Sequence, residues 1–422
     1  MAVEWRRRQS PEAVAGPVFE MTVDNVAHGG YVVGRHLGQV VFVRGALPGE
    51  RIRVQVTGRR SRLLYGQTVE VLDPSVDRVE HPWPTAVQQD VGGMDLGHMS
   101  LSASRAWKAK VISEQMARLA HVDWQGEVQS APGDDQRGGL GWRSRMRLRV
   151  DSQGRIGMTA ARSHRFVATP SLPMADQAIG QWLAGVGGRL PPLADQTITV
   201  VHPSAGRWDE PPTDSDTAWP KDKVVVIGAG GHCDVRELVR NDFGHWQYGV
   251  AADGFWQVHA AAPALLTQAV WAALDKVDGP VWDLYAGAGL FTKVLAQYFQ
   301  RPILAVEASP SGVKWLRRNT ADLDVTVLGE DVTKALVQMA VKPGGLMVAD
   351  PPRNGIGRMG VTAIIDHQPA RIIYVACDPA ALARDTNWLM AAGYRLSQLQ
   401  AFDLFPLTHH VECLAQFDLT GR

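Results

Sequence analysis

Beyond about residue 244, the sequence alternates short apolar runs with segments of helical periodicity. The runs VWDLYA, ILAVEA, VTVLGED, GGLMVADPP and RIIYVACDP are apolar almost throughout. Apolar strands that alternate with helices predict a mostly parallel, doubly wound sheet that is covered on both faces. Ligands of such sheets bind beyond the carboxyl ends of the strands, so the residues that follow each run are the first candidates for a functional site.

The first two strand ends predict an adenosine-binding site. Tyr285 and the glycines Gly287 and Gly289 follow the first strand, and the glycines let the backbone pass close beneath a ligand. Glu307 ends the second strand, where a carboxylate can accept both hydroxyl groups of a ribose. Nicotinamide-binding folds share this pattern, and a pure packing role for the glycines is the alternative.

The next two strand ends carry aspartates. Asp331 follows the third strand, where it could accept a hydrogen bond from an adenine amino group, and a lone surface acid is the alternative. Asp350 follows the fourth and precedes two prolines, which fix φ and end the ladder. The prolines would hold this carboxylate at the sheet edge beside a transferring group, and a simple strand stop is the alternative.

A cysteine and a glutamate are the candidate catalytic residues. Cys377 ends the fifth strand and precedes Asp378 and Pro379, which suit the start of a helix. We expect the helix dipole to favour its thiolate, the nucleophilic form, and an inert core cysteine is the alternative. Glu412 lies in the apolar stretch LTHHVECLAQFDL, where burial would raise its pKa and suit it to removing a proton. Its alternative role is to hold a loop.

The N-terminal half is rich in short β-branched runs and in arginine. From Pro17 to Pro74, runs punctuated by Gly, Pro and Asn predict a small antiparallel barrel. A helix is expected between Ser100 and Leu119, and a loop at 202–223. Two basic groups are candidate contacts for the phosphates of a polyanion, with a solvated hairpin tip and a compensated sheet face as the alternatives. They are Arg59, Arg60 and Arg62 in GRRSRLLYG, and Arg143, Arg145, Arg147 and Arg149 in WRSRMRLRVD, where alternation would project all four from one face.

Composition narrows the classes of protein. The 43 basic and 43 acidic residues cancel, so a polyanion would have to be held by local basic patches. The three cysteines match no disulfide scaffold and no zinc motif. No run of about 18 apolar residues and no export signal is present, so we expect a cytoplasmic protein without a membrane partner.

The motifs DLYAGAGLFT, ADPPRNG, YVACDPAALARD and HHVECLAQF, together with AHGG and VVFVRGALPGE, resemble the RNA uridine-5-methyltransferase family, and most of all its 23S rRNA branch. The resemblance implies a TRAM barrel at 1–75, a β-rich RNA-contacting domain at 76–245 and a Rossmann-like α/β methyltransferase domain at 246–422. It implies S-adenosylmethionine as methyl donor, and a helix near 100–121 that packs on the catalytic domain. By the same resemblance Cys377 is the nucleophile and Glu412 the base, and the methyl-donor positions are those of Gln257, Tyr285, Glu307 and Asp350.

One departure from the family concerns an iron–sulfur cluster that many of its members carry. Trp83, Val91, Met94 and Leu172 occupy the positions of the cysteine ligands, so we expect neither a cluster nor another metal. We expect a monomer that acts on RNA, and ribosomal RNA before transfer RNA because a TRAM domain is present, which is an argument by analogy. Two rivals remain: an RNA-binding protein without catalysis, against which both Cys377 and Glu412 argue, and a methyltransferase for a small molecule or an exocyclic amine, which would need no thiol.

Overall fold

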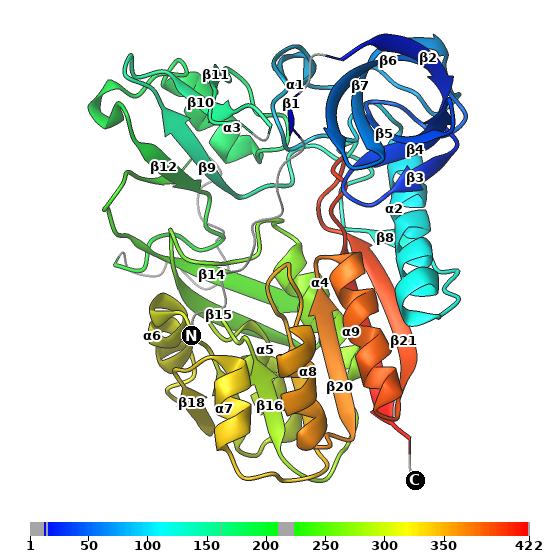
Figure 1. The fold of residues 1–422 in the computed structure, drawn as a ribbon. Coiled ribbons are helices and arrows are strands. Elements are labelled where there is room, and N and C mark those ends of the chain that lie inside the picture. Colours follow the sequence, from blue (N-terminus) through cyan, green and yellow to red (C-terminus); the bar gives the residue numbers. More distant parts are fainter. Residues whose placement is uncertain (1–11, 14–15, 162, 210–222, 421–422) are drawn as a thin grey trace.

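The computed structural model describes residues 12–13, 16–161, 163–209 and 223–420, and Figure 1 shows three regions along the chain. Part of the loop that we expect at 202–223, residues 210–222, lies outside the described residues. Within the described ranges, no helix is both long and apolar enough to cross a membrane.

The N-terminal strands form the predicted barrel. They pair in the order β1-β6-β7-β5-β4-β3, with β2 also paired to β6, and curl around buried valines such as Val41 and Val43. Along β6, Ile52 and Val54 point into this core, whereas Arg51 and Arg53 point outward and pair with Glu20. The strands are β1 (Glu12–Ala13), β2 (Val18–Thr22), β3 (Asn25–Ala27), β4 (Tyr31–His36), β5 (Gln39–Arg44), β6 (Arg51–Arg60) and β7 (Leu63–Asp73).

The second region is an antiparallel sheet in the order β11-β10-β9-β12-β13. Its buried face packs on helix α3 (Gln177–Gly185), whose first turn is capped by the side chain of Asp176. The strands are β9 (Arg145–Val150), β10 (Ile156–Thr159), β11 (Phe166–Ala168), β12 (Thr197–Val201) and β13 (Val225–Ile227); α1 (Pro84–Gln89) and a 3₁₀ turn (Pro191–Leu193) complete the region.

The third region contains the predicted α/β fold. Its sheet has the order β18-β17-β16-β19-β20-β22-β21-β8, parallel from β18 to β20 and antiparallel at β22. The strand order reverses between β16 and β19, which is where open α/β sheets bind ligands. The strands are β16 (Val281–Leu284), β17 (Ile303–Val306), β18 (Val325–Leu328), β19 (Leu346–Ala349), β20 (Arg371–Ala376), β21 (Tyr394–Asp403) and β22 (Glu412–Leu419).

Helices cover both faces of this sheet, which explains why its strands are apolar on both sides. Ile373 and Val375 of β20 pack in the core that contains α4 and α5, whereas Ile372 and Tyr374 pack in the core that contains α8 and α9. The helices are α4 (Ala262–Ala273), α5 (Leu290–Phe299), α6 (Pro310–Asn319), α7 (Val332–Gln338), α8 (Gly357–Asp366) and α9 (Pro379–Ala391).

Two segments from earlier in the chain also belong to the catalytic core. Helix α2 (Leu101–Gln115), continued by a π-helical turn (Met116–Ala120), packs on the sheet, and buried Lys108 donates to Asp403 and to the carbonyl of Phe405. Strand β8 (Val128–Ser130) extends the sheet beside β21. The hairpin β14 (Asp234–Asn241) and β15 (Gly244–Ala251) packs under α4 and α6, so the boundary that we predict at residue 245 falls inside it.

The four side chains at the expected cluster positions are buried together. Trp83, Val91, Met94 and Leu172 belong to one apolar core with the second sheet, and each is less than a tenth exposed. No group of three metal-ligating side chains occurs among the described residues. We predict that anaerobically purified protein contains no stoichiometric iron and no charge-transfer absorbance, because these positions offer no thiolate. Stoichiometric iron in such a preparation would contradict this assignment.

Arg145 corrects the prediction that four arginines share an exposed RNA-binding face. Arg147 and Arg149 are exposed on β9, but Arg145 is 6% exposed and pairs with Glu237 at 3.2 Å. Its guanidinium also donates to the carbonyls of Ala251, Ala252 and Gly254. Arg145 therefore ties the second sheet to the hairpin. Strand alternation could not reveal this, because the covering loop comes from a distant part of the chain.

Replacing Arg145 should cost stability. Arg145→Gln removes the cation that pairs with the buried carboxylate of Glu237 and leaves only the hydrogen bonds from Ser204, so the free energy of unfolding should fall by about 3 kcal/mol. The matched change Arg147→Gln, at an exposed position of the same strand, should shift it by less than about 0.5 kcal/mol. Urea unfolding curves measure the free energy of unfolding of both variants. Equal midpoints for the two variants would contradict the structural role of Arg145 and leave it as a candidate RNA contact.

Candidate active site

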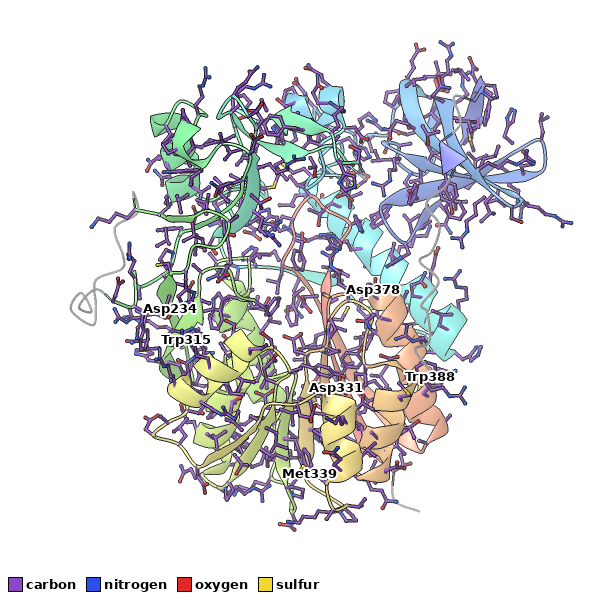
Figure 2. The ribbon with its side chains drawn as sticks, turned by 60° about the vertical axis from the view of Figure 1, so that its left-hand side comes forward. Asp234, Trp315, Asp331, Met339, Asp378 and Trp388 are labelled. Carbon is purple, nitrogen blue, oxygen red and sulfur yellow. The ribbon has the colours of Figure 1, made fainter. Side chains whose placement is uncertain are left out.

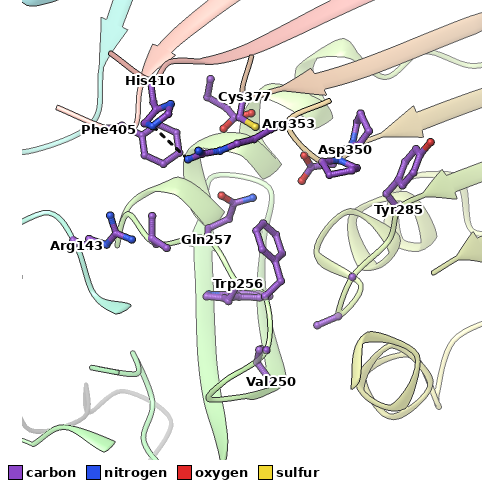
Figure 3. A pocket seen from close by; sticks show the side chains of 18 of the residues that line it. Arg143, Val250, Trp256, Gln257, Tyr285, Asp350, Arg353, Cys377, Phe405 and His410 are labelled. Atoms are coloured by element: carbon purple, nitrogen blue, oxygen red, sulfur yellow. Dashed lines mark hydrogen bonds between the residues drawn. The ribbon is translucent and has the colours of Figure 1, made fainter. Parts of the chain in front are cut away.

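A cavity of about 770 Å³ opens at the carboxyl ends of the parallel strands, at the point where the strand order reverses (Figure 3). It brings together most of the residues that the sequence singles out for chemistry. Those that line it are Gln257, Tyr285, Gly287, Glu307, Asp350, Cys377 and Glu412, with Arg143 at one side. Residues from all three regions of the chain contribute to its wall.

The glycine turn after β16 and the acidic end of β17 are joined directly. Glu307 accepts hydrogen bonds from the backbone N–H groups of Gly287 at 2.9 Å and Ser309 at 2.6 Å. Gly287 has φ of 55°, in the left-handed region that glycine tolerates. Tyr285 adopts φ of 62° without being a glycine, a strained conformation that structures retain at functional sites. Backbone and carboxylate thus meet at the cavity wall in the arrangement that an adenosine group requires.

Cys377 and Glu412 lie opposite each other at the ends of two paired strands. Ala376 of β20 pairs with Cys413 of β22 in antiparallel register. Cys377 follows Ala376 and Glu412 precedes Cys413, so the same register places Cys377 opposite Glu412. Side chains alternate across a sheet, so Cys377 and Glu412 share the face toward the cavity, whereas Ala376 and Cys413 are buried in the core behind it. Cys413 is therefore a core residue.

The charge state of Cys377 differs from our expectation. Burial, together with the carboxyl groups of Glu412 and Asp350, raises the pKa of Cys377 to about 12, and only Arg353 opposes this shift. The N-terminus of α9 does not stabilise the thiolate, because the carboxylate of Asp378 caps it by accepting from the N–H of Ala381 at 2.8 Å. In the free protein the thiol is protonated at neutral pH.

Glu412 has the environment that the sequence predicts. It is 4% exposed, its Oε1 has no hydrogen-bond partner, and burial raises its pKa well above the usual range. Asp350 is also affected: burial and the neighbouring Asp283 raise its pKa to about 7. Arg353 is the cation that acts on Cys377 and Glu412, and it donates toward Nε2 of His410 at 3.4 Å (Figure 3). The cavity therefore holds a protonated thiol and two buried carboxyl groups whose pKa values are raised, a grouping that is common at functional sites.

The raised pKa of Cys377 gives a testable pH dependence. Alkylation follows the thiolate fraction, so the rate for Cys377 in the free protein should rise about tenfold per pH unit between pH 7 and 10 without levelling off. An unperturbed cysteine would level off near pH 8.5. Peptide mass spectrometry after timed iodoacetamide treatment separates Cys377 from the other two cysteines. A plateau below pH 9 would contradict the assignment.

Several predicted binding residues lie outside the cavity. Asp331 stands at the top of α7, where its carboxylate accepts from the N–H of Lys334 and caps the helix (Figure 2). Predicted RNA-binding arginines outside the cavity are exposed. They include Arg59, Arg60 and Arg62 at the β6–β7 hairpin, and Arg147 on β9. Their roles in binding adenine and RNA stay predictions.

The cavity also contains residues that the sequence analysis missed. Arg44 comes from the barrel, Asp95 from the segment before α2, and His409 from the loop before β22. His409 is hydrogen-bonded to Asp95 through its backbone N–H, at 3.2 Å, and through its ring. Only the folded chain brings these three segments together, so no local pattern marks them. Phe255, by contrast, is an exposed aromatic residue two positions before Gln257, and its residue type could have drawn attention.

The strand order and the glycine turn define a Rossmann-like methyltransferase with an added N-terminal barrel. The sequence profile described as tRNA (uracil-5-)-methyltransferase matches residues 234–417, and that of the TRAM domain matches residues 14–69. The chain belongs to the TRAM-containing family of S-adenosylmethionine-dependent RNA uracil-5-methyltransferases.

Relatives of known name cover nearly the whole chain. An RNA methyltransferase of Bifidobacterium longum is 35% identical, over 94% of this chain and 96% of its own. The 23S rRNA (uracil(1939)-C(5))-methyltransferase RlmD of Shewanella sediminis is 28% identical, over 94% of this chain and 95% of its own. The crystal structure of the Pyrococcus abyssi tRNA (uracil-54, C5)-methyltransferase with S-adenosyl-L-homocysteine has a TM-score of 0.67 at 17% identity. It covers 94% of this chain and 100% of the other, and at that identity it supports the fold alone.

Proposed function

We propose that this enzyme methylates carbon 5 of a uridine in ribosomal RNA, with Cys377 as nucleophile and Glu412 as base. The observation that carries the proposal is the pairing of these two side chains on one face at the ends of β20 and β22, in a cavity that also contains the glycine turn. Carbon 5 of uracil is a poor nucleophile, and a thiolate that adds to the neighbouring carbon 6 can activate it.

In the proposed order of reaction steps, Cys377 acts as the nucleophile and Glu412 as the base. The Cys377 thiol releases its proton to water, and the thiolate adds to carbon 6, which places an electron pair on the enolate of the ring. Carbon 5 then forms a bond to the methyl group, whose bond to sulfur breaks. Glu412 as carboxylate takes the proton from carbon 5, the carbon 5–carbon 6 double bond re-forms, and the thiolate leaves. The cation of Arg353 favours the ionised forms of Cys377 and Glu412 during these steps.

We assign the methyl donor to the part of the cavity that the glycine turn lines. Gly287 brings the backbone to the cavity, Glu307 can still accept ribose hydroxyls beside its two backbone contacts, and Gln257, Tyr285 and Asp350 surround the same space. S-adenosylmethionine supplies an electrophilic methyl group there. Phe255, 74% exposed at the cavity, provides an aromatic surface on which a base extruded from RNA can stack.

Ribosomal RNA is our proposal for the substrate, by similarity to the RlmD relative, and transfer RNA is the second candidate because of the matching family profile and the archaeal fold relative. The test is a map of 5-methyluridine in ribosomal and transfer RNA from a strain without this gene. The proposal predicts loss of one or more sites in ribosomal RNA, restored by the wild-type gene. Loss confined to transfer RNA would favour the second candidate, and loss of a methylated amine would contradict carbon 5 chemistry.

A further inference from the structure

The N-terminal barrel forms part of the catalytic cavity. Nε2 of His28, in the β3–β4 turn, lies 3.1 Å from Oδ2 of Asp378, the residue directly after Cys377. Gly30, in the same turn, has φ of 80°, and a Cβ at this position would lie 2.8 Å from Oδ2 of Asp95. The turn therefore packs against the active-site segments too closely for a side chain. Arg44, at the end of β5, lines the cavity itself.

Arg44 is held in place without an ion pair in the described part of the chain, although its charge contributes to lowering the pKa of Asp95, after the larger effect of His409. Its Nη2 donates to the carbonyl of Gly29 at 3.2 Å, and its guanidinium carbon lies 4.4 Å from the centre of the Tyr31 ring. Its Nε is buried and has no hydrogen-bond partner, and no carboxylate lies within 4 Å of the guanidinium in the described part of the chain. Asp95, the acid on this side of the cavity, is already hydrogen-bonded to His409.

Two further arginines at the same cavity lack an acidic partner within the described residues. Arg143 precedes β9 of the second sheet, and Arg353 follows β19 of the catalytic sheet. Burial and the nearby charge of Arg353 lower the pKa of Arg143, so the two cations repel each other in the free protein. Each region of the chain thus contributes one guanidinium group that forms no ion pair with the described residues, an arrangement that favours a bound polyanion.

We propose that Arg44 binds a backbone phosphate of the RNA strand that enters the cavity, so that the barrel completes the substrate site. The inference rests on the proposed function, because a nucleotide turned into the cavity brings its flanking phosphates to the cavity mouth. Phosphate contacts position a strand without reading its sequence, and a preformed guanidinium donor suits that task. Arg44 would then place the target uridine over Cys377, which lies beyond the same turn of the barrel.

The test measures methyl transfer to total RNA from a strain that lacks this gene, a substrate pool that includes both ribosomal and transfer RNA. Arg44→Gln should lower kcat/KM for RNA about tenfold and reduce the slope of log(kcat/KM) against log[salt] by about 0.7. The KM for S-adenosylmethionine should not change. Arg44→Lys should keep the salt slope, because it keeps the charge. Arg35→Gln is the matched control, since Arg35 is exposed on the neighbouring strand β4 and does not line the cavity.

Two results would overturn the inference. One is Arg44→Gln with wild-type kcat/KM and salt slope. The other is a loss of activity in Arg44→Gln that Arg44→Lys does not restore and that accompanies an equal fall in the melting temperature of both variants, which would make Arg44 a structural residue. Failure of the wild-type enzyme to produce 5-methyluridine in this RNA would instead contradict the proposed function, so the two failures are distinguishable.

Discussion

Cys377→Ala should abolish methyl transfer to RNA, with a fall in kcat of several orders of magnitude. Without addition at carbon 6, carbon 5 of the uracil ring does not become nucleophilic enough to take a methyl group. Because Cys377 is not among the residues that we assign to the methyl donor, the affinity for S-adenosylmethionine should stay within about twofold of wild type. Transfer of labelled methyl groups to RNA, together with equilibrium binding of the methyl donor, measures both quantities.

Cys413→Ala is the matched control for this variant. Cys413 is the neighbouring thiol on β22, but it faces the core and does not line the cavity. Its loss should cost about 1 kcal/mol of stability through the small void, and leave kcat unchanged. Substantial activity in Cys377→Ala would contradict the nucleophile assignment and favour a thiol-independent methyltransferase, such as one for an exocyclic amine.

Glu412→Gln should stop the reaction at a later step and accumulate protein that is covalently bound to RNA. The variant keeps Cys377 and the methyl-donor wall, so addition and methyl transfer proceed, but nothing removes the proton from carbon 5. The methylated adduct then cannot collapse by elimination. Neutral glutamine also takes a potential negative charge away from the buried thiol, which lowers the pKa of Cys377 and favours addition.

Denaturing electrophoresis with methyl-labelled S-adenosylmethionine detects this adduct as a labelled, RNA-linked protein band that disappears after ribonuclease treatment. Glu330→Gln provides the control, because it makes the same chemical change at an exposed carboxylate that pairs with Lys334. It should turn over normally and accumulate nothing. Normal turnover by Glu412→Gln would assign the proton transfer to another group, with Asp350 as the next carboxyl in the cavity.

The sequence was sufficient to predict the residues at the strand ends because chain geometry alone brings them together. Parallel strands expose their carboxyl ends at one edge, so the glycine turn, Glu307, Asp350 and Cys377 could be expected to meet there. Asp331 shows the limit of that argument. It follows a strand in the same way, but the adjoining helix α7 uses its carboxylate as a cap.

Tertiary packing decides what a local pattern cannot. Alternation on β9 predicts an exposed Arg145, but the loop at Gly254 covers it and provides carbonyl acceptors. Helix periodicity predicts α2 without showing that Lys108 on it is buried against Asp403. The prediction of a thiolate at Cys377 was wrong for the same reason, because burial, together with carboxyl groups from two other segments, raises the pKa of the thiol. Arg44 enters the cavity only because the barrel packs on the catalytic region.

The most direct measurement for the central claim is mass spectrometry of the adduct formed by Glu412→Gln. After digestion of both protein and RNA, we expect a peptide in which Cys377 carries one uridine nucleotide with an added methyl group. Parallel sequencing of the linked RNA fragment identifies the target nucleotide. A modified residue other than Cys377, or a linked nucleotide without the methyl group after incubation with S-adenosylmethionine, would contradict the proposed order of addition, methyl transfer and proton removal.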